Sequence, residues 1–155
     1  MKVHLWAFGN LSDKWVSDGE KLYSKRIEHY LSFEYKTIQP SKSNVASQVL
    51  VAESKWLQQQ IDTTPSKIIL LDEKGPQLTS VQFSKKFDQW RQGSHRRLIF
   101  LIGSAYGFDK SVYEKADELL SLSAMTLPHQ LCRLLFLEQI YRACTILRGE
   151  SYHHE

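Results

Sequence analysis

Residues 98–103 read Leu98-Ile99-Phe100-Leu101-Ile102-Gly103, an uninterrupted apolar run that stops at a glycine. A second run, Ile68-Ile69-Leu70-Leu71-Asp72, has the same form and ends at an aspartate. Short continuous apolar runs are typical of strands that are covered on both faces, as in a parallel sheet. The sequence therefore predicts two central strands, each of which opens into a polar or glycine-bearing segment.

Strand and helix patterns alternate on either side of these runs. Further strands are expected over 3–8 and 33–38, with a short extended piece over 120–123. The spacing of apolar residues predicts helices over 13–27, 44–60, 79–90, 111–119 and 128–147. This alternation predicts an α/β fold, with a mostly parallel sheet and helices on both faces. No linker or repeat interrupts residues 1–155, so a single domain is expected.

Local signals predict where the helices begin. Ser12 is a suitable N-cap for the first helix, and Thr79-x-x-Gln82 and Ser111-x-x-Glu114 match the capping-box pattern. Pro128 suits the first turn of the last helix. These signals set the helix boundaries more sharply than apolar spacing alone.

Composition narrows the class of protein. The formal net charge is only +3, so the chain as a whole is not a general binder of nucleic acid. A basic stretch over 85–97 holds five Lys or Arg against one Asp, and such a stretch either binds phosphate or forms a solvated helix face. Cys132 and Cys144 lie twelve residues apart in one predicted helix and cannot bond to each other, so reduced thiols are expected.

The first residues are too polar for a signal peptide, and no apolar run is long enough to span a membrane, so a cytoplasmic protein without a membrane partner is expected. The terminal His153-His154-Glu155 lacks the fixed geometry of a metal site, and no metal is expected. Nothing matches a nucleophile elbow, which argues against that class of hydrolase.

Three segments follow predicted strands and should meet at the carboxyl edge of the sheet, where α/β proteins bind ligands. They begin at Leu71, Gly103 and Leu122. The pattern is neither G-x-G-x-x-G nor a P-loop. An ordinary strand exit explains Gly103 and Gly107 as well as a cofactor site does, and His129 is either a catalytic group or a hydrogen-bonded structural residue.

Four motifs carry a resemblance to a known family. They are Leu-Ile-Gly at 101–103, Leu-Ser-x-Met-Thr-Leu-Pro-His at 122–129, Glu-Gln-x-Tyr-Arg-Ala at 138–143 and Arg-Gly-Glu-x-Tyr-His at 148–153. In this order and spacing they resemble the RlmH family, SPOUT-class methyltransferases that act on a pseudouridine of bacterial large-subunit ribosomal RNA. The likeness extends over essentially the whole chain.

The resemblance implies a deep C-terminal trefoil knot, a homodimer and S-adenosyl-L-methionine as methyl donor. Methyl transfer to N3 of a pseudouridine in 23S ribosomal RNA, within the assembled ribosome, would be the reaction. The implied cofactor-binding residues are Leu71, Gly103, Leu122, Ser123, Ala124, Met125, Thr126 and Leu127.

On the substrate side, the expected catalytic residues are Tyr152, His153 and Arg142, with Arg133 as a further candidate for positioning RNA. His153 or a nearby water would take the N3 proton. Two alternatives stay open: a non-catalytic RNA-binding or ribosome-associated module that keeps the fold, and an unrelated nucleotide-binding enzyme of flavodoxin-like shape.

Two positions depart from the family pattern. Ser104 stands where a second glycine is usual, and His154 where arginine or lysine is usual. If position 104 needs a positive φ, serine costs about 1 kcal/mol or more; with a negative φ the change is nearly silent. The loss of a cation at position 154 weakens a phosphate contact from the tail.

Overall fold

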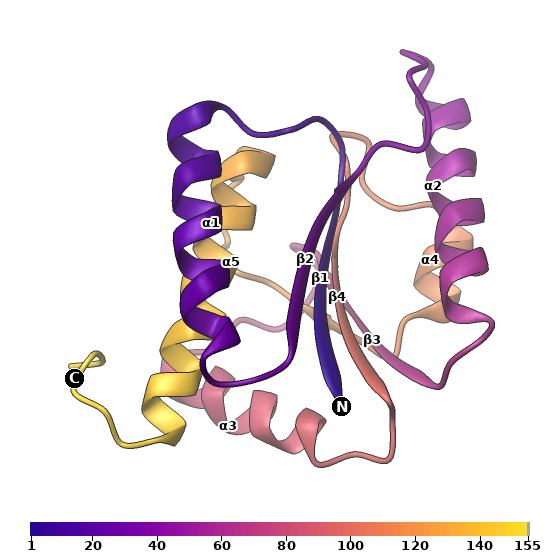
Figure 1. The fold of residues 1–155 in the computed structure, drawn as a ribbon. Helices are drawn as coiled ribbons and strands as arrows, with labels where there is room; N and C mark the ends of the chain where they lie inside the picture. The colour runs from indigo at the N-terminus through magenta and orange to yellow at the C-terminus, as the bar shows by residue number, and fades with distance from the viewer. Residues whose placement is uncertain (155) are drawn as a thin grey trace.

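A computed structural model describes residues 1–154 of the chain, and Glu155 lies outside the described residues. Five strands and five helices alternate along it (Figure 1). The strands are β1 Lys2–Phe8, β2 Phe33–Ile38, β3 Ser66–Leu71, β4 Arg97–Ile102 and β5 Glu118–Leu120. The helices are α1 Lys14–Glu28, α2 Ala46–Ile61, α3 Ser80–Arg91, α4 Lys110–Lys115 and α5 His129–Leu147.

The strands form one sheet in the order β2-β1-β4-β3-β5, and every neighbouring pair is parallel. Parallel strands cannot be connected by tight hairpins, so the chain crosses a face of the sheet between successive strands, which is why helices cover both faces. The predicted α/β class, parallel sheet and covered faces are confirmed. β4 lies in the centre, flanked by β1 and β3, and carries the run that ends at Gly103.

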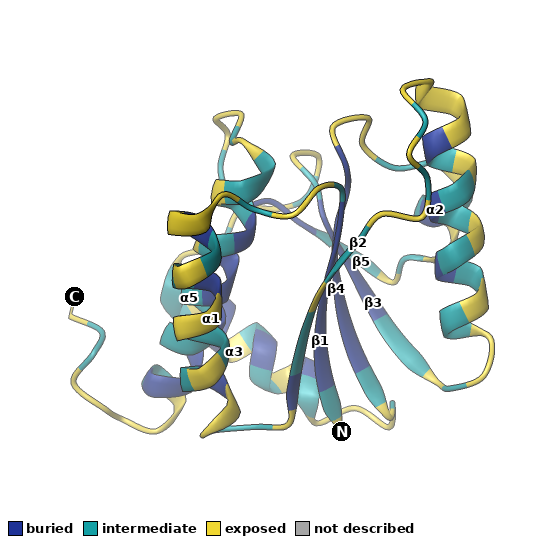
Figure 2. Cartoon of the chain, turned by 45° about the horizontal axis from the view of Figure 1, so that its top comes forward, coloured by how far each residue is buried: buried dark blue, intermediate teal, exposed yellow. Residues whose placement is uncertain are grey.

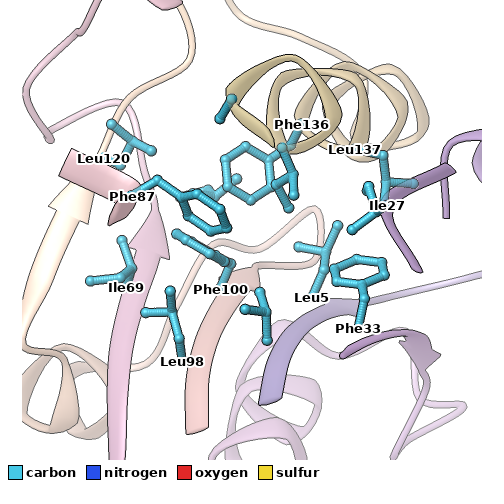
Figure 3. Packing of buried hydrophobic residues seen from close by; sticks show 14 of the residues in the cluster. Leu5, Ile27, Phe33, Ile69, Phe87, Leu98, Phe100, Leu120, Phe136 and Leu137 are labelled. Atoms are coloured by element: carbon cyan, nitrogen blue, oxygen red, sulfur yellow. The ribbon is translucent and has the colours of Figure 1, made fainter. Parts of the chain in front are cut away.

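The two faces of the sheet have separate cores. Helices α1, α3 and α5 cover one face, where Phe100 of β4 packs on Phe136 of α5 with ring centroids 4.9 Å apart (Figure 3). Helices α2 and α4 cover the other face through Leu57 and Val112. Residues of β1, β3 and β4 are mostly buried and those of the edge strands β2 and β5 are mostly half-buried, whereas the loops at the carboxyl edge are largely exposed (Figure 2).

The cap predictions were right for one helix and wrong for two. The Thr79/Gln82 capping box starts α3. The N-cap of α1 is Asp13, and Ser12 instead donates a hydrogen bond to Glu20 Oε1 at 2.7 Å. The N-cap of α4 is Asp109, whose side chain accepts the Ser111 amide, and Ser111 itself lies inside the first turn of the helix.

Helix α4 is shorter than predicted, and Leu119 belongs to β5. The Asp117 carboxylate accepts the Ile68 amide at 2.6 Å, which draws the chain onto the edge of β3 soon after the helix ends at Lys115. The expected extended piece over 120–123 is thus displaced toward the N-terminus, and residues beyond β5 form a loop.

Candidate functional site

A pocket of about 470 Å³ opens at the carboxyl edge of the sheet, where β3, β4 and β5 end. This volume lies within the usual range of small-molecule sites. Seven of the eight residues expected to bind a cofactor line it; they are Leu71, Gly103, Leu122, Ser123, Met125, Thr126 and Leu127. Ala124 is exposed and lies outside the lining. The structure therefore brings together three segments that are distant in sequence.

Gly103 is required by the close packing of its own loop. A Cβ at this position would lie 2.9 Å from the Gly107 carbonyl oxygen, nearer than real Cβ atoms approach. Gly107, which has φ +75°, closes the turn by donating its amide to the Ser104 carbonyl at 3.0 Å. The strand exit is thus a compact turn whose residues line the pocket.

Ser104 adopts a negative φ, as does every other non-glycine residue among 1–154. The backbone at this position therefore does not need glycine, and the conformational penalty considered from the sequence does not arise. The serine hydroxyl donates instead to Glu53 Oε2 of α2 at 3.1 Å. The departure at Ser104 is compatible with an intact loop.

Side chains also fix the rim of the pocket. His129 hydrogen-bonds the backbone of Gly103, which agrees with the structural alternative for this histidine; burial, followed by the charge of Arg133, lowers the pKa of its ring. Tyr113 donates a hydrogen bond to Asp72 Oδ2 at 2.5 Å, while Asp72 Oδ1 accepts the Lys74 amide. Asp72 is therefore a carboxylate held in place at the end of β3.

A second cluster gathers at the other end of α5. The carboxylate of Glu138 accepts hydrogen bonds from Arg142 and, at 3.1 Å, from the Tyr152 hydroxyl. The Arg142 guanidinium also lies over the Tyr152 ring, 4.8 Å from its centroid, and its Nη1 is 3.2 Å from His153 Nδ1. Arg142, Tyr152 and His153, which were predicted to act together, thus form one network around Glu138.

The network also sets the hydrogen-bonding roles of its members. Burial and hydrogen bonds with Tyr23 and Glu138 raise the pKa of Tyr152 above its usual range, so this phenol keeps its proton. A guanidinium only donates hydrogen bonds, so His153 accepts at Nδ1 and a neutral ring carries its proton at Nε2. In this arrangement the Tyr152 proton is directed at Glu138 and the His153 ring is held against Arg142, so the network fixes the positions of both side chains.

The pocket and the tail cluster lie far apart within one chain. Thirteen residues of α5 separate His129 at the pocket from Arg142, which at the helical rise is about 20 Å. The C-terminal tail lies on the side opposite the carboxyl edge (Figure 1). The two clusters cannot act on one atom of a substrate within a single copy of the chain.

The expectation that Arg133 contacts RNA was wrong. The residue is only 1% exposed and cannot reach a substrate on the surface. Its guanidinium donates to the carbonyl oxygens of Phe8 and Asn10, at 3.0 and 2.6 Å. A buried cation is stable only with such partners. Arg133 is therefore a structural residue that ties the end of β1 to the last helix.

Comparison with known proteins agrees with this geometry. A family model described as "Predicted SPOUT methyltransferase" matches residues 1–153. The chain belongs to the SPOUT methyltransferase family. A relative from Cytophaga hutchinsonii, named ribosomal RNA large subunit methyltransferase H, is 43% identical and covers 99% of this chain and 100% of its own length. A relative of the same name from Trichlorobacter lovleyi is 39% identical, with the same coverage.

Solved structures show the same fold at low sequence identity. A probable methyltransferase from Bordetella pertussis superimposes with a TM-score of 0.56 at 9% identity, over 92% of this chain and 94% of that one. A probable methylase family protein from Haemophilus influenzae also gives 0.56, at 8% identity, over 99% of this chain and 70% of that one. The flavodoxin-like alternative is thereby set aside in favour of the SPOUT fold.

Several residues of this SPOUT methyltransferase site were not singled out from the sequence. Glu138 was named as part of the motif at 138–143, and Glu53 was not considered. The spacing of residues in α2 could have indicated that Glu53 is buried. Glu53 lies four residues after Val49 and four before Leu57, on the apolar side of the helix. A carboxylate at such a position is rare unless it has a partner.

Within residues 1–154, no group of three or more His, Cys, Asp or Glu is arranged to hold a metal ion. No helix in the same range is long and apolar enough to cross a membrane. Both cysteines lack a disulfide, as expected, and burial raises the pKa of each thiol to about 11.

Proposed function

We propose that this protein transfers a methyl group from S-adenosyl-L-methionine to N3 of a pseudouridine in 23S ribosomal RNA, on the assembled ribosome in the cytoplasm. The observation that carries the proposal is the pocket at the ends of β3, β4 and β5, built by the segments that resemble the donor site of the family. Full-length relatives named for methylation of large-subunit ribosomal RNA support the substrate class.

The pocket suits this donor in size and chemistry. Its walls come largely from the Gly103–Gly107 turn and the segment over 122–127, where small and apolar residues would let main-chain groups bind an adenosine and an amino-acid group. Asp72 adds a fixed carboxylate beside a donor that carries positive charge. The bound donor supplies an already activated methyl group, so the protein's task is alignment.

The substrate side is assigned to Arg142, Tyr152 and His153. Tyr152 and His153 would position the base, while Arg142 orients both of them through Glu138 and the His153 ring. Because His153 Nδ1 already accepts from Arg142, we assign removal of the N3 proton to a water molecule. The basic stretch over 85–97 would steer RNA toward the protein, with binding that weakens as salt rises.

A homodimer is part of the proposal because one copy leaves its pocket and tail about 20 Å apart. The tail of one copy would complete the pocket of its partner. We also include the C-terminal knot of the family. The segment over 75–77 lies directly against residues 120–121, where Ser121 donates its amide to the Pro76 carbonyl at 3.0 Å, and this close crossing supports it.

The deciding experiment is mass spectrometry of 23S ribosomal RNA from cells with and without the gene. We expect one methyl group on a pseudouridine to be lost and then restored by purified protein and donor on whole ribosomes. Unchanged methylation would instead support the non-catalytic ribosome-associated module. Calorimetry with S-adenosyl-L-methionine separates the two functions further, since the module predicts no binding.

A test of the two-copy site mixes a Gly103→Val protein with a Tyr152→Phe/His153→Ala protein. Each is expected to be inactive alone. Subunit exchange would create one intact pocket beside one intact tail and restore up to about a quarter of wild-type activity, if copies pair at random and each dimer holds two sites. Inactive mixed dimers would contradict a site shared between copies.

A further inference from the structure

Glu53 carries a buried carboxyl group that contacts the Gly103–Gly107 turn, called the pocket turn below. It belongs to α2 and is 3% exposed, between the buried residues Val49 and Leu57. Burial raises the pKa of Glu53 to about 7, while the hydrogen bond from Ser104 acts in the opposite direction. Placing such a group in the core costs stability, so its contact should serve some other purpose.

The contact of Glu53 is with the residue that begins the pocket turn. Ser104, itself 7% exposed, donates its hydroxyl to Glu53 Oε2 at 3.1 Å and closes the turn to Gly107 with its own carbonyl. Further along the turn, the Tyr106 hydroxyl reaches the Asn44 carbonyl just before α2, at 3.4 Å. After β4 the chain crosses toward α2 before it enters α4 (Figure 1). Helix α2 and the segment just before it therefore hold the turn through these two hydrogen bonds.

We propose that Glu53 is a positioning residue for the methyl donor, acting through the Ser104 hydroxyl to fix the Gly103–Gly107 turn. This inference rests on the proposed function and deepens it. Gly103 and Ser104 both line the pocket, so a shift of the turn moves the main-chain groups that would face the donor. In this chain the serine in place of the usual glycine becomes one half of a specific pair.

Glu20 provides a matched control. It is also a buried glutamate, 5% exposed, and its Oε1 accepts hydrogen bonds from Ser12 and Tyr35 at 2.7 and 2.9 Å. It lies on α1, and neither it nor its two partners line the pocket. Removing the carboxylate of Glu20 tests loss of a buried polar network without disturbing the turn.

The test measures donor affinity by calorimetry on the folded full-length protein. Glu53→Met and Ser104→Ala each remove one side of the contact, and both should raise the Kd for S-adenosyl-L-methionine by roughly three- to tenfold, the effect of one hydrogen bond. The Kd of the double variant should be no higher than that of the single variant with the higher Kd, because the two changes remove one interaction. Glu53→Gln keeps an acceptor oxygen and should stay within about twofold of wild type.

Glu20→Met should lower the denaturation midpoint yet leave the Kd unchanged. In the ribosome assay, Glu53→Met should raise the KM for the donor more than it lowers kcat. A wild-type Kd in folded Glu53→Met or Ser104→Ala protein would overturn the positioning role while leaving the proposed function intact. Absence of donor binding by the wild-type protein would overturn both proposals.

Discussion

The two ends of helix α5 carry different kinds of chemical groups. At its amino end the pocket presents main-chain groups of a tight turn and small or apolar residues such as Gly103, Ser123 and Leu127. At its carboxyl end a glutamate, an arginine, a tyrosine and a histidine interlock through hydrogen bonds and ring contacts. The first end suits recognition of a ligand by shape, and the second suits chemistry that depends on placed protons.

This difference separates the effects that variants should have. A change at the pocket should alter donor affinity and leave the tail intact, whereas a change at the tail should alter turnover and leave affinity intact. Because the helix keeps the two ends about 20 Å apart, neither change should reach the other end within one chain.

The largest effect is expected from the double change Tyr152→Phe and His153→Ala. Methylation of ribosomes should fall by at least about 100-fold, since both side chains proposed to position the base are lost. The Kd for S-adenosyl-L-methionine, measured by calorimetry, should stay within twofold of wild type. Near-wild-type turnover would remove these residues from the mechanism, and a weakened Kd would break the separation of the two ends.

Gly103→Ala should act at the pocket alone. The added Cβ would meet the Gly107 carbonyl oxygen at 2.9 Å, so the turn must shift, and donor affinity should fall roughly 10- to 100-fold at an overpacking cost of about 1–3 kcal/mol. Gly149→Ala offers a comparison at an exposed glycine with no atom near its Cβ; its φ is +69°, so it tests backbone strain away from the pocket. Equal affinity losses in the two variants would contradict a role for Gly103 at the site.

The pH dependence of protein stability tests whether the Glu53 carboxyl is buried and titrates as described. Its folded pKa of about 7 exceeds the ordinary value of 4.5, so the folded state binds more protons than the unfolded state between these values. Stability should therefore fall as pH rises. From pH 5.5 to 7.5 the wild type should lose about 2 kcal/mol relative to Glu53→Gln, which cannot titrate there. Urea unfolding of both proteins at the two pH values measures this difference, and a constant difference would contradict a buried titrating carboxyl.

The smallest effect should come from Glu138→Gln. The amide keeps one acceptor oxygen but loses the charge that holds Arg142 and Tyr152, so kcat should fall about tenfold with an unchanged donor Kd. Glu114→Gln is the control, because its exposed pairing with Lys110 at 3.9 Å lies away from both ends and should have no measurable effect. Equal turnover in the two variants would place Glu138 outside the positioning network.

What could be predicted from the sequence follows from the range of the interactions involved. Periodicity located the strands, and their parallel arrangement then implied that the segments after Leu71, Gly103 and Leu122 meet, because these facts follow from local pattern and sheet geometry. Ser12 and Ser111 were misassigned as caps because each helix begins at a different residue: α1 follows Asp13, whose side chain makes no capping hydrogen bond, and α4 follows Asp109, which accepts the Ser111 amide. Arg133 and Glu53 could not be placed, since a charged side chain shows its burial only when its distant partners are known.

The contacts of Arg133 bear on how the chain is made. Its guanidinium bonds carbonyls 123 and 125 residues earlier, at the end of the first strand. The first strand is thus finished by a side chain that is synthesised 123 to 125 residues later, and contacts of such long sequence separation form slowly. The sheet edge that carries the pocket therefore takes its final form only after the chain has been synthesised as far as α5.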